Sequence, residues 1–290
     1  MPPINGYATL SDWKNTKDIE SLDNVDDSVI EQLIESASRF IDEKTAKTFY
    51  PRVQTRYHSV PSGETDPEEL WLDDDLLEII TLTNGNGVVI SSSDYYTKPR
   101  NDYPKYAIAL KSSSSISWAT DANGNSEYVI PVNAFWGFHA EYNLRGWKIV
   151  SLIDHEGGIT PTRNPIGTLA ADIAKFNDGD IIKIDNEIMI IASHGSVVDP
   201  DINTGITVVQ RGDNGSTPAD HTDQIPIYVW QPMPTIRMAC MEIVKSAYSR
   251  RFGTNTTGTA IITGAGVVIT PEEVPAFAWN IINTYKPDVP

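Results

Sequence analysis

The chain has 290 residues, of which 40% are apolar and 21% charged, and 39 acidic residues against 22 basic ones give a formal net charge of −17. This composition is typical of a globular protein, and the length predicts two units of about 100 to 200 residues each. No apolar run approaches the roughly 18 residues that span a bilayer, so we expect a soluble protein. The acidic excess disfavours tight DNA binding through the whole surface.

The N-terminal part of the chain predicts two helices and no secretory signal, which indicates synthesis in a cytoplasm. The segment "TLSDWKNTK" is typical of a short helix capped by Thr9. Ser28 and Glu31 then form a capping box before a longer helix of about 18 residues. Its apolar residues recur at helical spacing: Ile30, Leu33, Ile34, Ala37 and Ile41.

Two β-rich parts follow. From Tyr50 to Asn143, short β-prone runs and the hairpin signal "NGNG" at 84–87 predict a small mixed or antiparallel sheet packed on helices. From near Gly146, "DGDIIKIDNEIMIIAS", "GITVVQR" and "IPIYVWQP" predict four even, short strands, the first two of which are joined by a turn at "DN" (185–186). We expect these to form a small barrel or sandwich of about 85 residues.

The helical pattern returns in "PMPTIRMACMEIVKSAYSRRFG", with Pro234 near the start and Gly253 as the C-terminal cap, and a last helix is expected from about Pro275. The predicted fold class is therefore α+β. An α-helical core with a small β-sheet region carries an inserted all-β barrel or sandwich. The expected domains are 1–144 and 231–290 for the two parts of the core and 145–230 for the inserted β-module.

The triplet Arg211-Gly212-Asp213 invites comparison with integrin ligands. It follows directly on a β-run and precedes "NGS", so a strand end leading into a tight turn is the better interpretation. The loops "DPDINTG" and "DANGNSE" alternate oxygen ligands as calcium sites do. Both lack the glycine offset and the twelfth-position glutamate of an EF-hand loop, which favours polar hairpin loops.

Other candidate chemistry is equally weak. The run Asp73, Asp74 and Asp75 could supply carboxylates for hydrolysis, but adjacent side chains do not converge, so a solvated turn is favoured. The five histidines show no metal-ligand spacing. The single cysteine, Cys240, lies in an apolar helical pattern that predicts a buried small side chain. We therefore predict no catalytic residue, no metal site, no cofactor and no enzymatic activity.

The order of segments resembles that of the head-tail connector, or adaptor, proteins of tailed bacteriophages. The segments are "YATLSDW", "IEQLIESASRFIDEKTAKTFYP", "LWLDDDLLEIITLT", "DYYTKPRNDYPKYAIAL", "IPVNAFWGF", "IRMACMEIVKSAYSRRFG" and "VPAFAWNIINTYKP". The resemblance covers about residues 1–144 and 231–290. The region between is similar to a β-module of phage structural proteins, whose Arg-Gly-x-Asn-Gly turn corresponds to residues 211–215.

This resemblance implies a structural protein of the virion neck, between head and tail. Such proteins form a ring, expected to be dodecameric, beneath the portal protein, and they present a platform to a stopper or tail protein. Genomic DNA would pass through the lumen without sequence-specific binding, and no membrane is involved. An acidic lumen would not retain the genome, and ring closure would avoid an open filament.

The resemblance also implies that the segment 270–290 docks on the portal. Its apolar anchors would be Phe277, Trp279 and Tyr285. Arg250 and Arg251 are the one compact basic feature. Their place at a helix C-terminus explains them through the helix dipole, and a portal or DNA contact is the other interpretation.

Two other functions remain open at this point. The acidic, loop-rich residues 145–230 could be the binding head of a receptor-binding or adhesive virion component. An envelope-degrading hydrolase using Asp or Glu pairs is the third hypothesis, and it rests on the number of carboxylates alone.

Overall fold

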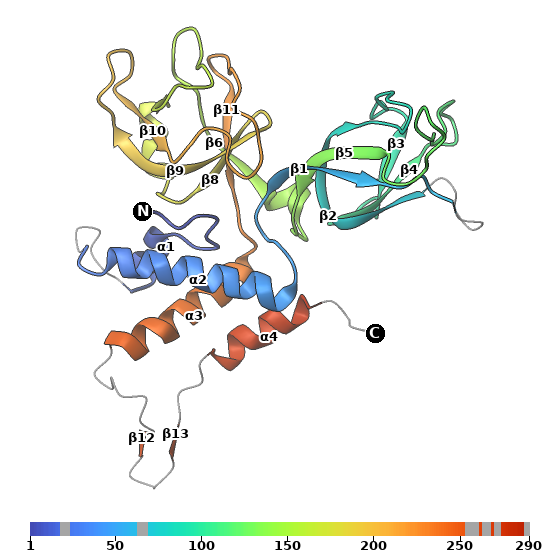
Figure 1. The fold of residues 1–290 in the computed structure, drawn as a ribbon. Helices are drawn as coiled ribbons and strands as arrows, with labels where there is room; N and C mark the ends of the chain where they lie inside the picture. The colour runs from blue at the N-terminus through green and yellow to red at the C-terminus, as the bar shows by residue number, and fades with distance from the viewer. Residues whose placement is uncertain (18–23, 63–68, 253–260, 263–267, 270–273, 287–290) are drawn as a thin grey trace.

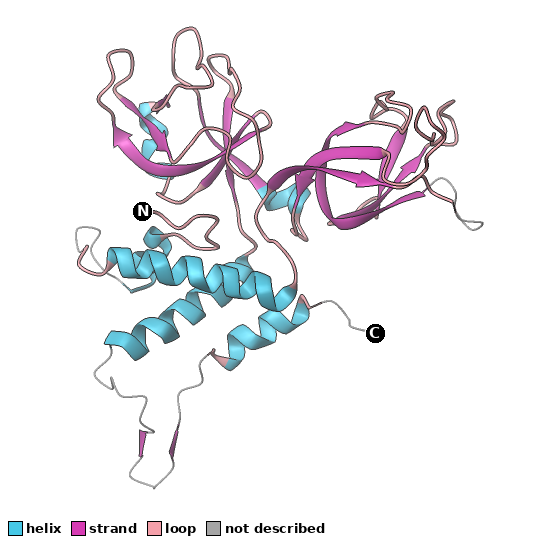
Figure 2. Ribbon diagram, viewed as in Figure 1, coloured by secondary structure: helices cyan, strands magenta, loops and turns pink. Residues whose placement is uncertain are grey.

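The computed structural model describes residues 1–290 except 18–23, 63–68, 253–260, 263–267, 270–273 and 287–290. Two antiparallel sheets, of five and six strands, lie side by side above a group of helices (Figure 1). Colouring by secondary structure makes clear that strands outweigh helices in the described part of the chain (Figure 2).

The helices come from the two ends of the chain. α1 (Leu10–Lys17) and α2 (Asp27–Thr45) precede both sheets, whereas α3 (Pro234–Phe252) and α4 (Ala276–Thr284) follow them. α3 contacts both α2 and α4. Because each helix is apolar on one face, the two ends bury those faces together. Fully buried side chains of this core include Ile34, Ile41, Ile236, Cys240, Val244, Ala278 and Ile282.

The caps of the first two helices differ in how well they were predicted. The backbone N–H of Asp12 donates to Thr9 Oγ1 at 3.1 Å, and Thr9 N–H donates to the Asp12 carboxylate at 2.9 Å, so the Thr9 cap is confirmed. The capping box at Ser28 and Glu31 is wrong. α2 has Asp26 as its N-cap without a side-chain cap bond, and Glu31 pairs instead with the N-terminal ammonium group at 3.1 Å.

The five-stranded sheet occupies the chain between α2 and the second sheet. Its strands are β1 (Arg52–His58), β2 (Glu69–Leu82), β3 (Tyr95–Lys98), β4 (Lys105–Leu110) and β5 (Ile130–Trp136), in the order β1-β5-β2-β4-β3. The predicted turn at 84–87 is confirmed. Asn84 N–H donates to Val88 C=O at 2.8 Å, and Gly87 takes a φ of +80°, which glycine adopts without strain.

The six-stranded sheet has the order β6-β11-β8-β9-β10-β7. Its strands are β6 (Trp147–Leu152), β7 (Ile166–Gly167), β8 (Ile181–Ile184), β9 (Glu187–Ser196), β10 (Thr204–Val208) and β11 (Pro226–Trp230). The predicted turn at Asp185 and Asn186 joins β8 to β9, with Asp185 at a φ of +51°. Buried isoleucines and valines from both faces form its core.

Three short elements complete the described chain. The π-helix Tyr142–Gly146 leads into β6, and the 3₁₀-helix Ala170–Lys175 precedes β8. The strands β12 (Ile261–Ile262) and β13 (Val268–Ile269) pair between α3 and α4. This pair lies on the far side of the helices from both sheets (Figure 1).

The predicted fold class, an α-helical core with a small β-sheet region, is wrong. Two antiparallel sheets of five and six strands form most of the structure, and the helices are few. The sequence pattern underestimates the strand content because β-bulges interrupt the alternation of buried and exposed residues. Strand β2 runs for 14 residues, yet register shifts between Trp71 and Leu76 and between Leu76 and Glu78 break the alternation of buried and exposed side chains.

Replacing Ile34 with alanine is expected to lower the free energy of unfolding by about 2 to 5 kcal/mol, because Ile34 is fully buried between the helices of the two chain ends. Gln32→Ala, at an exposed position of the same helix, should change it by less than about 0.5 kcal/mol. Urea unfolding followed by circular dichroism measures both variants. Equal effects would contradict the packing of α2 described above.

Candidate binding pocket at the junction

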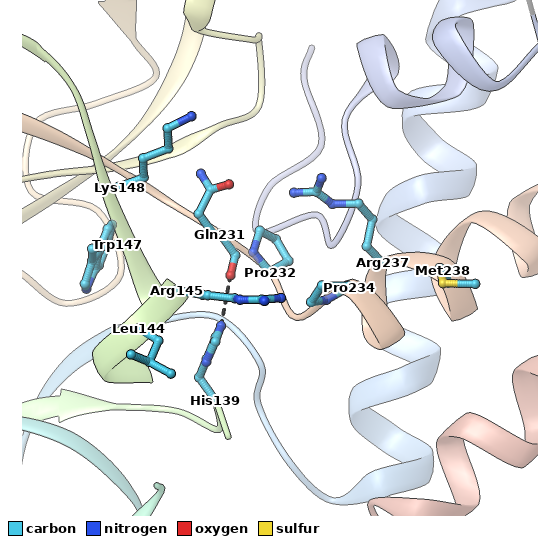
Figure 3. A pocket seen from close by; sticks show the side chains of 10 residues that line it. All are labelled: His139, Leu144, Arg145, Trp147, Lys148, Gln231, Pro232, Pro234, Arg237 and Met238. Carbon is cyan, nitrogen blue, oxygen red and sulfur yellow. Dashed lines mark hydrogen bonds between the residues drawn. The ribbon is translucent and has the colours of Figure 1, made fainter. Parts of the chain in front are cut away.

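A cavity of about 450 Å³ lies where the π-helix, the start of β6 and the start of α3 meet (Figure 3). Its polar lining consists of the side chains of His139, Arg145, Lys148, Gln231 and Arg237. Its apolar lining consists of the side chains of Leu144, Trp147, Pro232, Pro234 and Met238. Such a volume with a mostly apolar wall and a few polar groups is typical of ligand sites.

Gln231 joins the segments that build the wall. Its N–H donates to the carbonyl of Gly146 at 3.0 Å, and its carbonyl oxygen accepts from His139 Nε2 at 3.1 Å (Figure 3). His139 Nδ1 accepts from the N–H of Glu141 at 3.1 Å, so the proton of the neutral ring is on Nε2. Burial lowers the pKa of His139, which keeps the ring neutral at pH 7.

Aromatic rings support this arrangement from behind. Trp230 is buried and makes edge-on contacts with His139 at 5.2 Å and with Trp147 at 5.0 Å between ring centroids. Such contacts add to the free energy of apolar burial. The position of Trp147, which forms one side of the cavity, is therefore set by the core behind it.

All charged side chains that line the cavity are cationic. The side chain of Lys148 is exposed and forms no ion pair or hydrogen bond within the described ranges of the chain. Arg145 pairs with Glu141 at 3.3 Å, and Arg237 lies 3.8 Å from Asp12, both with at least a quarter of each side chain exposed. Exposed pairs of this kind contribute little and exchange partners readily.

A second hollow, of about 430 Å³, continues from the first along α3. The two share Arg237 and Met238, and the second is also lined by Met241 and Glu242 of α3 and by Asp12, Asn15 and Thr16 of α1. We call the two hollows together the junction groove. In the described residues no group of histidine, cysteine and carboxylate side chains could hold a metal ion. The cations and the apolar side chains of the groove can bind an anionic or apolar group.

A different cluster, inside the six-stranded sheet, has the residue types of an acid–base site. Arg211 binds both carboxylate oxygens of Glu187, at 2.7 and 2.8 Å. His221 lies between two carboxylates, 2.8 Å from Glu187 and 2.8 Å from Asp185. Two acceptors require both ring nitrogens to donate, so His221 is protonated.

The pKa values in this cluster follow from those contacts. Burial alone would raise the pKa of Glu187, but the hydrogen bonds from Arg211, His221 and the N–H of Ala219 outweigh it and hold that pKa at about 2. Burial alone would lower the pKa of His221, and the two carboxylates raise it above 6.5 instead. The side chains of Glu187 and His221 are 0% and 1% exposed. Because no substrate could reach them, the cluster stabilises the fold.

The turn interpretation of Arg211-Gly212-Asp213 agrees with this position. Arg211 points inward, and its guanidinium also donates to the carbonyls of Arg163 and Ala219. Asp213 is buried and accepts from the N–H of Ile190 at 3.1 Å. The triplet is therefore not displayed at a loop tip.

The next residue, Asn214, ties the turn to the rest of the protein. Its side chain exchanges two hydrogen bonds of 2.8 Å with the amide of Asn5 and donates to the carbonyl of Pro51 at 3.0 Å. Its carbonyl accepts from the N–H of Val53 at 2.8 Å. One turn of the six-stranded sheet thus holds both the N-terminal segment and the start of β1.

The remaining sequence candidates have structural partners. The run Asp73–Asp75 lies within strand β2 and not in a turn as expected. Asp73 and Asp74 pair with Arg56, and Asp75 pairs with Lys47.

In the loop at 121–125, Asp121 accepts from the N–H groups of Asn123 and Asn125. In the loop at 199–203, Asp199 pairs with Arg163. Cys240 is fully buried, as predicted.

The predicted portal-contact residues lie on α4 and at the end of α3. Phe277 is 49% exposed. Trp279 contacts Phe40, while Tyr285 packs between Phe49 and Phe138. Arg250 is exposed in the last turn of α3, and the side chain of Arg251 lies outside the described residues.

Comparison with models of protein families, with curated proteins and with solved structures gave no match to this chain. The resemblance to head-tail adaptors therefore rests on the order and spacing of its segments. In the described residues, no helix combines the length and apolar character required to cross a bilayer.

Sequence reasoning missed the junction groove. Arg145 and Lys148 are far from Arg237 along the chain, and no spacing rule connects them. The one local signal was "LRGWK" at 144–148, where two cations flank a tryptophan.

Glu187→Gln is expected to lower the free energy of unfolding by about 3 to 5 kcal/mol at neutral pH, because it leaves the buried charge of Arg211 without a counter-ion and His221 with the exposed Asp185 alone. In the parent protein the contribution of Glu187 is complete above its unfolded pKa of 4.5 and is lost as the pH falls towards its folded pKa of about 2. The contribution of His221 is complete below pH 6.5 and is lost as the pH rises through its raised pKa.

Urea unfolding at several pH values measures this dependence. Asp185→Asn is the matched control, because Asp185 binds the same histidine but is 57% exposed, and it should cost less than about 1 kcal/mol. An unchanged acid dependence in Glu187→Gln would show that the cluster does not contribute as described.

Proposed function

We propose that this chain is a structural protein of a tailed-phage virion: a head-tail adaptor in the neck that forms a ring under the portal protein. The ring would extend the DNA channel and present a platform to a stopper or tail protein. The observation that carries the proposal is the order and spacing of the segments from "YATLSDW" to "VPAFAWNIINTYKP". The proposal assigns no enzymatic activity to the chain.

The packing of the helices supports this proposal. The segments that carry the resemblance lie on both sides of residues 145–230, and their helices share one core in which Ile34 and Cys240 are fully buried. A resemblance split by a long intervening region is meaningful only when its two halves form one body. The pairing of α2 with α3 meets that condition.

Exposed aromatic side chains also support a protein that buries surface against others. Trp71 and Tyr106 are 62% and 46% exposed and stack at 5.6 Å with an interplanar angle of 11°. Phe277 is exposed on α4. Aromatic residues are enriched at protein interfaces, and a closed ring has such an interface on both sides of every subunit.

We place the adaptor ahead of the receptor-binding alternative for one reason. An adhesive β-module needs a recognition element displayed to its receptor, and the Arg-Gly-Asp turn is turned inward, with Asp213 buried. The net charge of −17 fits a channel wall that does not retain DNA.

Negative-stain electron microscopy of the full chain, alone and mixed with the portal protein of the same virus, tests the proposal. We expect rings, either free or capping the portal, because ring closure satisfies both faces of each subunit. Monomers that do not associate with the portal would overturn the adaptor function and move the receptor-binding alternative to the front.

Phe277→Ala is expected to weaken portal binding by about tenfold or more, because truncating an aromatic anchor at the centre of an interface costs above about 1 kcal/mol. Val89→Ala is the control, since Val89 is 62% exposed and lies just after the turn at 84–87, where it bridges to Thr83. Surface plasmon resonance against immobilised portal measures both. Equal affinities for the two variants would remove Phe277 from the contact.

A further inference from the structure

We propose that the junction groove is a docking site for a peptide segment of a partner protein that carries an acidic side chain next to an apolar one. The inference uses the groove alone and holds whether or not the chain is an adaptor. It is argued from the charges at one end of the groove, the apolar floor along α3 and the rigidity of the wall.

Charge complementarity is the first argument. The chain has a net charge of −17, yet each charged side chain lining the cavity of Figure 3 is cationic: Arg145, Lys148 and Arg237. The Arg237 guanidinium makes no hydrogen bond within the described part of the chain, although Asp12 lies 3.8 Å away and Asp180 interacts with it electrostatically. A guanidinium with uncommitted N–H groups is suited to bidentate binding of a carboxylate.

The floor of the groove supplies the apolar part of the site. Met238 is 51% exposed on α3, and Met241, one turn further along, lines the second hollow. Methionine side chains adapt to irregular apolar partners and are common on peptide-binding surfaces. Leu144, which is 76% exposed, forms the opposite edge beside the cations.

The far end of the groove gives the peptide a direction. Glu242, one turn of α3 beyond Met238, lines the second hollow, as does Asp12, which lies 3.8 Å from Arg237. An acidic side chain is repelled there and attracted at the Lys148 end. The acidic residue of the peptide therefore lies by Lys148, and its apolar neighbour lies over Met238.

The wall of the groove is preorganised in the structure without a bound peptide. Gln231 is held through both of its backbone groups, and Trp147 is held by Trp230. A rigid wall lowers the conformational entropy that binding has to remove. The elongated shape, two hollows of about 450 and 430 Å³ joined at Arg237 and Met238, suits an extended peptide better than a compact ligand.

Methyl NMR of the full chain with labelled methionines provides the test, because the chain has only five methionines. The probe is a synthetic peptide with two leucines flanked by glutamates, and its twin has glutamines in place of the glutamates. We expect the acidic peptide to shift the signals of Met238 and Met241. Met189, fully buried in the six-stranded sheet, should stay unchanged. The glutamine twin should bind at least about fivefold more weakly.

Lys148→Glu is the decisive variant, since Lys148 is exposed and its replacement leaves the core intact. It should weaken binding of the acidic peptide by about fivefold or more, because attraction becomes repulsion. Lys175→Glu, exposed on the 3₁₀-helix and outside the groove, should bind as the parent does. Absence of shifts with the acidic peptide, equal shifts with both peptides, or unchanged binding by Lys148→Glu would each overturn the proposal.

Discussion

The backbone of Gln231 joins the three parts of this protein. Its carbonyl oxygen accepts from His139, which follows the last strand of the five-stranded sheet, and its N–H donates to Gly146, which precedes the first strand of the second sheet. The residues after Gln231 lead directly into α3. Both bonds are made by buried or half-buried groups, and an unpaired backbone group at such a place costs free energy. The junction groove exists because these segments meet here without filling the space between them.

Charge is arranged very differently in the interior and at the groove. Inside the six-stranded sheet, Arg211 and His221 are balanced by Glu187 and Asp185, and each nitrogen of these two side chains that can donate has an acceptor. At the groove, Lys148 has no acidic partner within the described residues, and Arg237 interacts with Asp12 and Asp180 without a hydrogen bond to either. Balanced buried charges hold a structure together, whereas cations left at the wall of a cavity are available to a ligand. The residue types are similar in the two places, and solvent access alone assigns them different roles.

Sequence reasoning succeeded where a short local rule decides the structure. The cap at Thr9, the turn at 84–87, the turn at Asp185 and the burial of Cys240 each depend on neighbours along the chain. It failed where distant partners decide. The capping box at Ser28 does not form, and Glu31 pairs with the N-terminal ammonium group instead. The aspartates at 73–75 stay within a strand because Arg56 and Lys47 neutralise them. The share of the chain in the two sheets was underestimated because bulges in β2 break the alternation of buried and exposed side chains.

The sequence by itself determined the helices at the two ends, most strands of the two β-rich parts and the turn at Arg211, because periodicity and turn chemistry act over a few residues. Only the tertiary structure decided the order of the strands in each sheet, the enclosure of Glu187 and His221, and the groove between Lys148 and Arg237. These features need contacts between segments far apart in the chain, and the free energy of such contacts is not encoded in any single stretch of residues. The groove is the clearest case, because its cations meet only after Gln231 has joined the segments that carry them.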